Sequence, residues 1–293
     1  MTEVIAVIAA GEMGAGIGKR LSERGARVLT SLSGRSAASA ARAREAGMIA
    51  VDDGTLVAEA GIILSVVPPG QAVAVAERLK PALARAAHRP LYIDGNAIAP
   101  ATAVRIGAVL AGTPCRYVDG GIIGPPPGPG RGPRLYVSGD AASEALRLAA
   151  YGLSVRVVEG PIGAASALKM SYAGITKGLT AVGTAMMLGA ARAGLTDALR
   201  RELNESQPQL TAWLTRQVPR MFPKAYRWVA EMEEIAAFVE EDHAAQAMFL
   251  AIARLYERMA AGASNEATAR EIATLSGFWA EQEGSVAGRS TTA

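Results

Sequence analysis

The chain has 293 residues, enough for one large domain or two ordinary ones; half of the residues are apolar and 19% are charged. This composition is typical of a folded globular protein and excludes a disordered one. The 30 basic and 27 acidic residues give a formal net charge of +3 and are dispersed, which excludes nucleic acid as an expected partner. With one cysteine, Cys115, and two distant histidines, we expect no disulfide, no metal site and no Ser/His/Asp hydrolase.

The first residues and the longest uncharged runs indicate whether the protein is secreted or crosses a membrane. The opening sequence MTEVIAV has no basic run, and it leads directly into a strand-like pattern. The longest uncharged runs, 60–76 and 178–191, are shorter than the roughly 18 apolar residues of a membrane-spanning helix. We therefore expect a cytoplasmic protein with no secretory signal and no membrane span.

Over the first 160 residues, short β-branched runs alternate with alanine-rich helical stretches. A strand at 4–9 is followed by a helix at 13–24, a strand at 27–32 and a helix at 37–46. Further strands are expected at 62–67, 91–94, 116–118, 135–138 and 155–158, with helices at 72–87 and 141–150 among them. This alternation predicts an α/β Rossmann-type doubly wound parallel sheet, forming a domain at 1–160.

After residue 160 the pattern becomes helical throughout. Between 164 and 195 only Lys169, Lys177 and Arg192 are charged, which predicts one long helix that is buried on nearly all sides. Amphipathic periodicity continues to about residue 277, so we expect an all-α substrate and dimerisation domain at 161–283 and a frayed tail at 284–293. The long apolar helix needs cover, which a homodimer or other helices of the same chain would supply.

The first strand leads into a dinucleotide fingerprint. Aligned with G-x-G-x-x-G, the sequence reads Ala9, Ala10, Gly11, Glu12, Met13, Gly14, so the first glycine is missing. Gly11 would let the backbone approach a pyrophosphate, and Gly14 would let the helix pack closely on the strand. The free N–H groups of the helix would hold the phosphates. The alternative is an ordinary strand-to-helix turn that uses glycine for its backbone.

The end of the second strand indicates which cofactor binds. NAD-binding proteins place an acidic residue there, but the segment 30–36, TSLSGRS, contains no carboxylate. Arg35, flanked by Ser33 and Ser36, instead offers charge-assisted hydrogen bonds to a 2′-phosphate. We therefore expect NADP(H) to be preferred over NAD(H). The alternative is that Arg35 is a solvated surface residue.

Five ordered motifs resemble those of the β-hydroxyacid dehydrogenases, the group of 3-hydroxyisobutyrate dehydrogenase and relatives of 6-phosphogluconate dehydrogenase. They are the fingerprint ending at Gly14, the strand end 65–68, the segments 93–100 and 118–124, and the segment 160–163 leading to Lys169. The match covers about the first 180 residues. The helical half is similar to a less characterised C-terminal subfamily of 6-phosphogluconate dehydrogenase-like oxidoreductases.

The resemblance implies roles for individual residues. Gly11, Glu12, Met13 and Gly14 would lie against the pyrophosphate, Val67 and Pro68 would line the nucleotide, and Asn96 would lie near the nicotinamide ribose. Lys169 would be the proton donor and acceptor for the substrate oxygen. Two positions depart from the family: its asparagine four residues after the lysine is Ala173, and the serine of its substrate loop is Ile123, followed by Gly124. A simple β-hydroxyacid is therefore not the only substrate to expect.

Helical spacing offers a partial replacement for the missing groups. Lys169, Tyr172, Thr176 and Lys177 are spaced i, i+3, i+7 and i+8, so they project from one face, and Tyr172 would share or relay the proton of Lys169. The alternative is that Lys169 extends to water while Tyr172 covers the core.

The segment 124–133, rich in proline and glycine, predicts a loop. As a wall of the substrate pocket it would bring Arg131 or Arg134 to an anionic substrate; the alternative is a mobile surface turn. The expected substrate contacts are thus Ile123, Gly124, Arg131 and Thr176.

Together these patterns predict an NADP(H)-dependent oxidoreductase that transfers hydride between nicotinamide and a small hydroxyacid or carbonyl substrate, with Lys169 and Tyr172 as the catalytic residues. An imine reductase is the first alternative, because Ala173 and Ile123 make the pocket more apolar. A non-catalytic NADPH-binding sensor or scaffold is the second.

Overall fold

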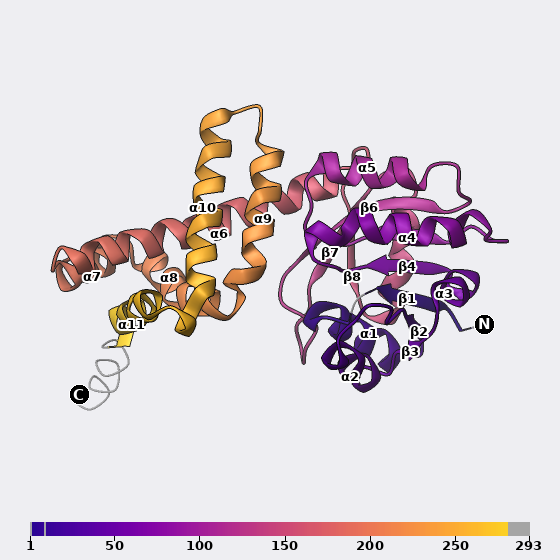
Figure 1. Cartoon of the computed structure of the whole chain (residues 1–293), viewed down its shortest axis with the longest axis horizontal. Coiled ribbons are helices and arrows are strands. Elements are labelled where there is room, and N and C mark those ends of the chain that lie inside the picture. Colours follow the sequence, from indigo (N-terminus) through magenta and orange to yellow (C-terminus); the bar gives the residue numbers. More distant parts are fainter. Residues whose placement is uncertain (1, 9, 281–293) are drawn as a thin grey trace, which may run out of the picture. The chain divides into compact units, whose positions relative to one another are not determined.

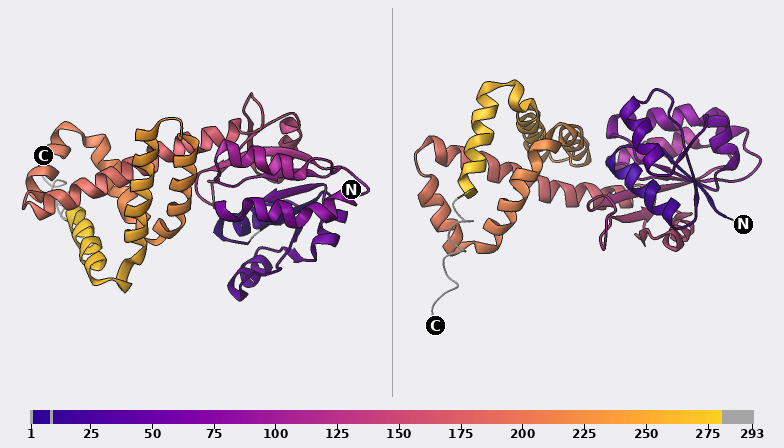
Figure 2. Two further views of the ribbon diagram at one scale, coloured as in Figure 1. Left: turned by 45° about the horizontal axis from the view of Figure 1, so that its top comes forward. Right: turned by 90° about the horizontal axis from the view of Figure 1, so that it is seen from below.

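The computed structural model describes residues 2–8 and 10–280. It divides into two compact units, one up to Ser171 and one from Tyr172, and each is described by itself. Figures 1 and 2 show that strands occur in the first unit and that the second is built from helices.

The first unit contains an eight-stranded sheet in the order β3-β2-β1-β4-β5-β6-β7-β8. The strands are β1 (Val4–Ile8), β2 (Arg27–Thr30), β3 (Ile49–Ala50), β4 (Ile62–Ser65), β5 (Leu91–Asp94), β6 (Arg116–Ile123), β7 (Arg134–Ser138) and β8 (Ser154–Val157). All neighbours are parallel except β6 and β7. Strands β1 to β3 are added in one direction along the sheet, and from β4, which lies beside β1, they are added in the other direction. This confirms the doubly wound sheet, and the point between β1 and β4 is where ligands bind in such folds.

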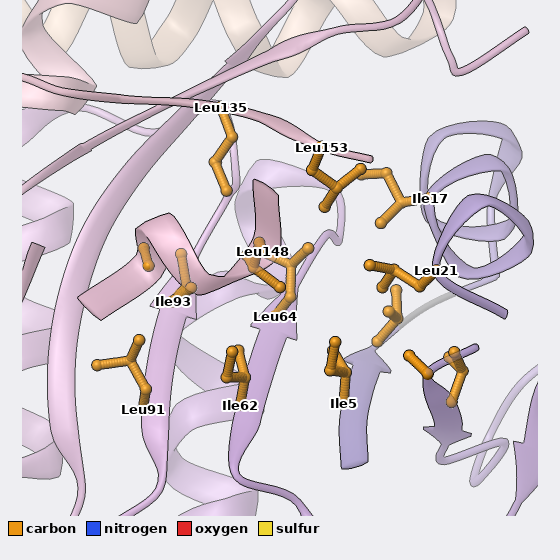
Figure 3. Packing of buried hydrophobic residues seen from close by; sticks show 14 of the residues in the cluster. Ile5, Ile17, Leu21, Ile62, Leu64, Leu91, Ile93, Leu135, Leu148 and Leu153 are labelled. Atoms are coloured by element: carbon orange, nitrogen blue, oxygen red, sulfur yellow. The ribbon is translucent and has the colours of Figure 1, made fainter. Parts of the chain in front are cut away.

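Helices cover both faces of this sheet. They are α1 (Glu12–Glu23), α2 (Ala37–Glu45), α3 (Asp53–Glu59), α4 (Ala72–Ala84), α5 (Pro100–Leu110) and the 3₁₀ segments η1 (Pro69–Gln71) and η2 (Ala142–Tyr151). Alternate residues of each strand enter different cores. Ile5 and Leu64 join Leu21 of α1 and Leu148 of η2 on one face, as Figure 3 shows. On the other face, α4 and α5 cover the second core.

The predicted strands and helices of this half are confirmed, with differences at particular places. The first strand is β1, whose predicted last residue, Ala9, lies outside the described residues. Three elements were not predicted: β3 and α3, which are short, and α5, which has 11 residues. The sheet is parallel as predicted except at β7, because the connection 124–133 is too short for a crossover and returns the chain antiparallel beside β6.

The second unit is all-helical, as predicted. Its helices are α7 (Thr196–Ser206), α8 (Pro208–Met221), α9 (Ala225–Phe238), α10 (His243–Ala261) and α11 (Glu266–Ala280), with 3₁₀ turns η3 (Phe222–Lys224) and η4 (Gly262–Ser264). They follow the long helix α6 (Ala164–Arg192), which starts in the first unit. The predicted frayed tail, 284–293, lies outside the described residues. Among the described helices, none combines the length and apolar character needed to cross a membrane.

Helix α6 is not buried on all sides, which corrects the sequence prediction. Its inner face carries glycines: a Cβ at Gly174 would lie 3.2 Å from the ring of Phe249 on α10, and one at Gly183 would lie 2.5 Å from Leu214 on α8. Its other face carries five exposed apolar side chains at spacings of three and four residues, which we call the apolar stripe: Tyr172, Ile175, Leu179, Val182 and Met186. Within the second unit, the helix therefore packs closely against the other helices with one face only.

Candidate functional site

Helix α1 begins at the fingerprint. Gly11 is its N-cap, with extended backbone angles, and no side chain caps this N-terminus in the described structure. A Cβ at Gly11 would meet nothing within 4 Å, so there is open space against its backbone, whereas Gly14 is buried. Arg42 of α2 holds the turn between β1 and α1, because its Nε donates to the carbonyl oxygen of Ala10 (2.9 Å). Open space beside uncapped N–H groups fits a pyrophosphate.

Beyond β2 lies a cluster of cationic side chains. The guanidinium of Arg35 donates to Oε1 of Gln71 (3.0 Å), and Arg78 of α4 donates to Oγ of Ser31 (3.4 Å) and forms an ion pair with Asp53 (3.4 Å). Burial, and after it the charge of Arg78, lowers the pKa of Arg35. Two guanidinium groups thus lie in this region, where Asp53 pairs with Arg78 and Asp52 lines the adjoining cavity. An anion bound there would form charge-assisted hydrogen bonds with the guanidinium groups.

The serines of this loop differ in their roles. Ser36 caps α2, because its Oγ accepts from the backbone N–H of Ser39 (3.3 Å), while Ser33 is exposed. A cavity of about 450 Å³ opens beside them, lined by Ser31, Leu32, Ser33 and residues 50–53. Sequence reasoning missed Arg78 because it lies 43 residues from Arg35 in the sequence, and only the packing of α4 brings it close.

Four neighbouring strands carry a buried polar residue at the same register position. Ser65 of β4 pairs with Asp94 of β5, Asp94 with Asp119 of β6, and Asp119 with Ser138 of β7. All four side chains are fully buried. We call these residues the polar row. It crosses the sheet at the carboxyl ends of the parallel strands, the edge where doubly wound folds bind their ligands.

Asn96 joins the ends of two strands next to the polar row. Its Oδ1 accepts from the backbone N–H of Val67 (2.5 Å), its Nδ2 donates to Oγ of Ser65 (3.2 Å), and its own N–H donates to Oδ1 of Asp94 (2.9 Å). Asn96 and Val67 are buried, and Pro68 is exposed. The structure therefore brings these three predicted residues together and ties the loop after β4 to the end of β5.

Lys169 lies against the end of β6. A Cβ at Gly121 would fall 2.7 Å from Cβ of Lys169 and 3.0 Å from the carbonyl oxygen of Ala165, so only a glycine permits this approach of strand and helix. Lys169 itself is half-buried. The side chain thus starts from the same sheet edge as the polar row.

The predicted substrate residues of the first unit lie on the connection from β6 to β7. Ile123 ends β6 and is buried, and Gly124 has a φ of +121°, a backbone region that favours glycine. Arg131 and Arg134 are exposed. The connection folds onto α1, where Arg20 donates to the carbonyl oxygen of Arg131 (3.3 Å) and, at 2.9 Å, to that of Gly128.

The other predicted members of the α6 face belong to the second unit. Tyr172 is 47% exposed, and the hydroxyl of Thr176 donates to its carbonyl oxygen (2.9 Å). Lys177 forms an ion pair with the buried Glu231, and its Nζ lies 4.8 Å from the ring centre of Trp228. Lys177 is therefore engaged within its own unit, a pairing that helical spacing alone does not reveal.

Fold and site together define a dinucleotide-binding protein. The family model described as the NAD binding domain of 6-phosphogluconate dehydrogenase matches residues 4–150. The chain belongs to this family and is an NAD(P)-dependent oxidoreductase, which confirms the resemblance seen in the sequence. A second model, Domain of unknown function (DUF1932), matches residues 190–259.

Two proteins of similar length show comparable identity. An uncharacterised 28.5 kDa protein of Methanothermus fervidus is 28% identical over 214 residues, which cover 72% of this chain and 81% of that protein. The structure of the conserved protein MTH1747, of unknown function and described as similar to 3-hydroxyacid dehydrogenases, is 28% identical. That match has a TM-score of 0.68 and covers 87% of this chain and 96% of the other.

More distant structures share the fold. A 3-hydroxyisobutyrate dehydrogenase of Mycobacterium tuberculosis, solved with L-serine, is 19% identical, with a TM-score of 0.68 over 94% of this chain and 99% of its own. An imine reductase variant of Myxococcus stipitatus in complex with NAD+ is 22% identical, with a TM-score of 0.58 over 88% and 94%. At these identities the likeness concerns the fold alone.

The ion pair of Lys177 and Glu231 yields a stability prediction for the second unit. Lys177→Met removes one partner of a buried ion pair and should lower the free energy of unfolding by about 3–5 kcal/mol, whereas the double variant with Glu231→Leu should recover most of this loss. Urea denaturation followed by tryptophan fluorescence measures it, because all three tryptophans lie beyond Tyr172.

The matched control is Arg270→Met, which removes an exposed pair with Glu266 in the same unit and should change stability by only about 0–1 kcal/mol. An equal effect of K177M and R270M would show that the buried pair carries no special weight.

Proposed function

We propose that this chain is an NADP(H)-dependent oxidoreductase that transfers hydride between nicotinamide and a small hydroxyacid or the corresponding carbonyl compound. The observation that carries the proposal is the contact of Lys169 with Gly121 at the ligand-binding edge of the sheet. An amine placed there is suited to exchange a proton with a substrate oxygen.

The residues around the start of α1 and the end of β2 fit the cofactor. The backbone N–H groups after Gly11 would hold the pyrophosphate, with Glu12, Met13 and Gly14 in the first turn of α1 beside it. Val67, Pro68 and Asn96 would border the nucleoside portion. Arg35, with Ser33, Ser36 and Arg78, would bind the 2′-phosphate that distinguishes NADP(H) from NAD(H). When bound, the cofactor supplies or accepts the hydride.

Side chains of the protein donate and accept the proton. In the direction of reduction, the ammonium of Lys169 gives a proton to the carbonyl oxygen as that oxygen gains negative charge, and it recovers the proton in oxidation. Tyr172, three residues further along α6, would relay this proton. Ile123 and Gly124, with Arg131 and Thr176, would contact the substrate.

A second copy of the chain would cover the apolar stripe. Spacings of three and four residues over two heptads are the pattern with which one helix packs against another, and its side chains are exposed, up to 72% at Ile175. A homodimer through α6 buries them and supplies the cover that this helix lacks within its own unit.

Cofactor choice is tested on Arg35. Arg35→Ala should weaken NADPH binding by about 1–3 kcal/mol, the loss of charge-assisted hydrogen bonds, and leave NADH binding nearly unchanged. Isothermal titration calorimetry with both cofactors measures this. Arg44→Ala, at an exposed arginine of α2, serves as the control and should change neither affinity. Equal losses for both cofactors would exclude Arg35 from the 2′-phosphate site.

The chemistry is tested on Lys169. Lys169→Met should lower the catalytic rate by about 10²–10⁴-fold, the contribution of a positioned general acid, while NADPH still binds. Hydroxyacids, aldehydes, ketones and cyclic imines are screened at the nicotinamide absorbance, with Lys80→Met, at an exposed lysine of α4, as the control. Turnover of cyclic imines alone would select an imine reductase. Tight NADPH binding without any turnover would select the sensor or scaffold.

The homodimer is tested by light scattering coupled to size-exclusion chromatography. The native chain should elute with twice the mass of one chain, and Ile175→Glu combined with Val182→Glu should give one chain's mass, since charges in the stripe oppose its burial. Val104→Glu, at an exposed position of α5, should leave the mass unchanged. A native chain with the mass of a monomer contradicts the proposal.

A further inference from the structure

Asp119 anchors the start of α6 to the sheet. Its Oδ2 accepts from the backbone N–H groups of Gly163 and Ser166 (both 3.0 Å), and its Oδ1 accepts from the hydroxyl of Ser166 (2.5 Å). The hydroxyl of Ser138 also donates to Oδ2 (2.9 Å) and accepts from the backbone N–H of Ala165 (2.9 Å). Two members of the polar row thus bind two consecutive positions at the helix N-terminus, Ala165 and Ser166, and the glycine before the helix.

The chemistry of this anchor requires a carboxylate. The first N–H groups of a helix have no partner within the helix, and the helix dipole makes its N-terminus positive. A fully buried carboxylate is stable only when hydrogen bonds replace its hydration, and Asp119 receives four. An asparagine of the same shape would present an N–H₂ group to at least one of these donors.

The anchor fixes the position of Lys169. Asp119 and Gly121 are two residues apart on β6, so the strand that holds the helix end also contacts Lys169, one turn into the helix. The hydrogen bonds set the height and rotation of α6, and the missing side chain at Gly121 sets its distance from the sheet. Neither constraint alone determines the position at which the Lys169 side chain leaves the helix.

We infer that Asp119 is a positioning residue for Lys169. It touches neither substrate nor cofactor and acts by holding the first turn of α6 in one register against β6 and β7. Ser138 supports it from the neighbouring strand. This inference rests on the proposed function of Lys169, but it adds a residue to which the sequence motif gives no role.

The test compares two aspartates that accept hydrogen bonds from the N–H groups at a helix N-terminus. Asp119→Asn should lower the catalytic rate by about 100-fold, the effect expected when a catalytic group moves by an ångström, while NADPH affinity stays within about twofold of the native value. Asp242→Asn, which alters the N-cap of α10 in the second unit, should leave the rate unchanged. Ser138→Ala, a milder change to the same anchor, should lower the rate severalfold and provides the answer where D119N fails to fold.

A double variant separates positioning from general damage. If Asp119 acts through Lys169, D119N combined with K169M should be no slower than K169M alone. Multiplying losses, or a full native rate in both D119N and S138A, would overturn the inference. A native rate in K169M would instead overturn the proposed function, so the two failures are distinguishable.

A second readout requires no substrate. Reductive methylation with ¹³C-formaldehyde labels the lysines, and the dimethyl-lysine resonance that is absent from K169M belongs to Lys169. D119N should shift this resonance and D242N should not, because only Asp119 sets the surroundings of that amine. An unshifted resonance in folded D119N would overturn the positioning role.

Discussion

Buried polar groups need partners inside the protein, and this requirement shapes the edge of the sheet where the site lies. Four adjacent strands bring the polar row together, because Ser65, Asp94, Asp119 and Ser138 occupy one register position on them. Ser65 and Asp94 form hydrogen bonds with Asn96, and Ser138 and Asp119 form hydrogen bonds with the N-terminus of α6. The hydrogen bonds that stabilise the strand ends therefore also hold the loop after β4 and the start of α6, the helix that carries Lys169.

The sequence predicts much of this fold because its signals are local. Apolar β-branched runs on both faces identify central parallel strands, and the glycines at positions 11 and 14 mark the turn into α1. The missed elements β3 and α3 are too short to show periodicity, since a strand of two residues has no alternation to detect.

The site was predicted less completely because its contacts depend on register and packing. Asp119 was visible within a motif, but its partners are contributed by β7 and α6, and a shift of one residue in the pairing of β6 with β7 would turn Ser138 to the other face. Likewise, helical spacing places Lys177 on one face of α6 with Lys169, but it cannot show that Glu231 on α9 pairs with it. Periodicity assigns a side chain to a face, and only tertiary contacts assign it a partner.

The cluster beyond β2 shows how the protein's own charges would contribute to cofactor choice. Burial and the charge of Arg78 lower the pKa of Arg35, but a guanidinium remains protonated at neutral pH. The like charges of the two arginines repel each other, and Asp53 offsets part of this repulsion at Arg78. A 2′-phosphate dianion would relieve it at both, whereas a neutral ribose hydroxyl would not. In the proposed preference for NADP(H), relief of this repulsion would add to the new hydrogen bonds, and because added salt screens partly exposed charges, the preference should weaken as ionic strength rises.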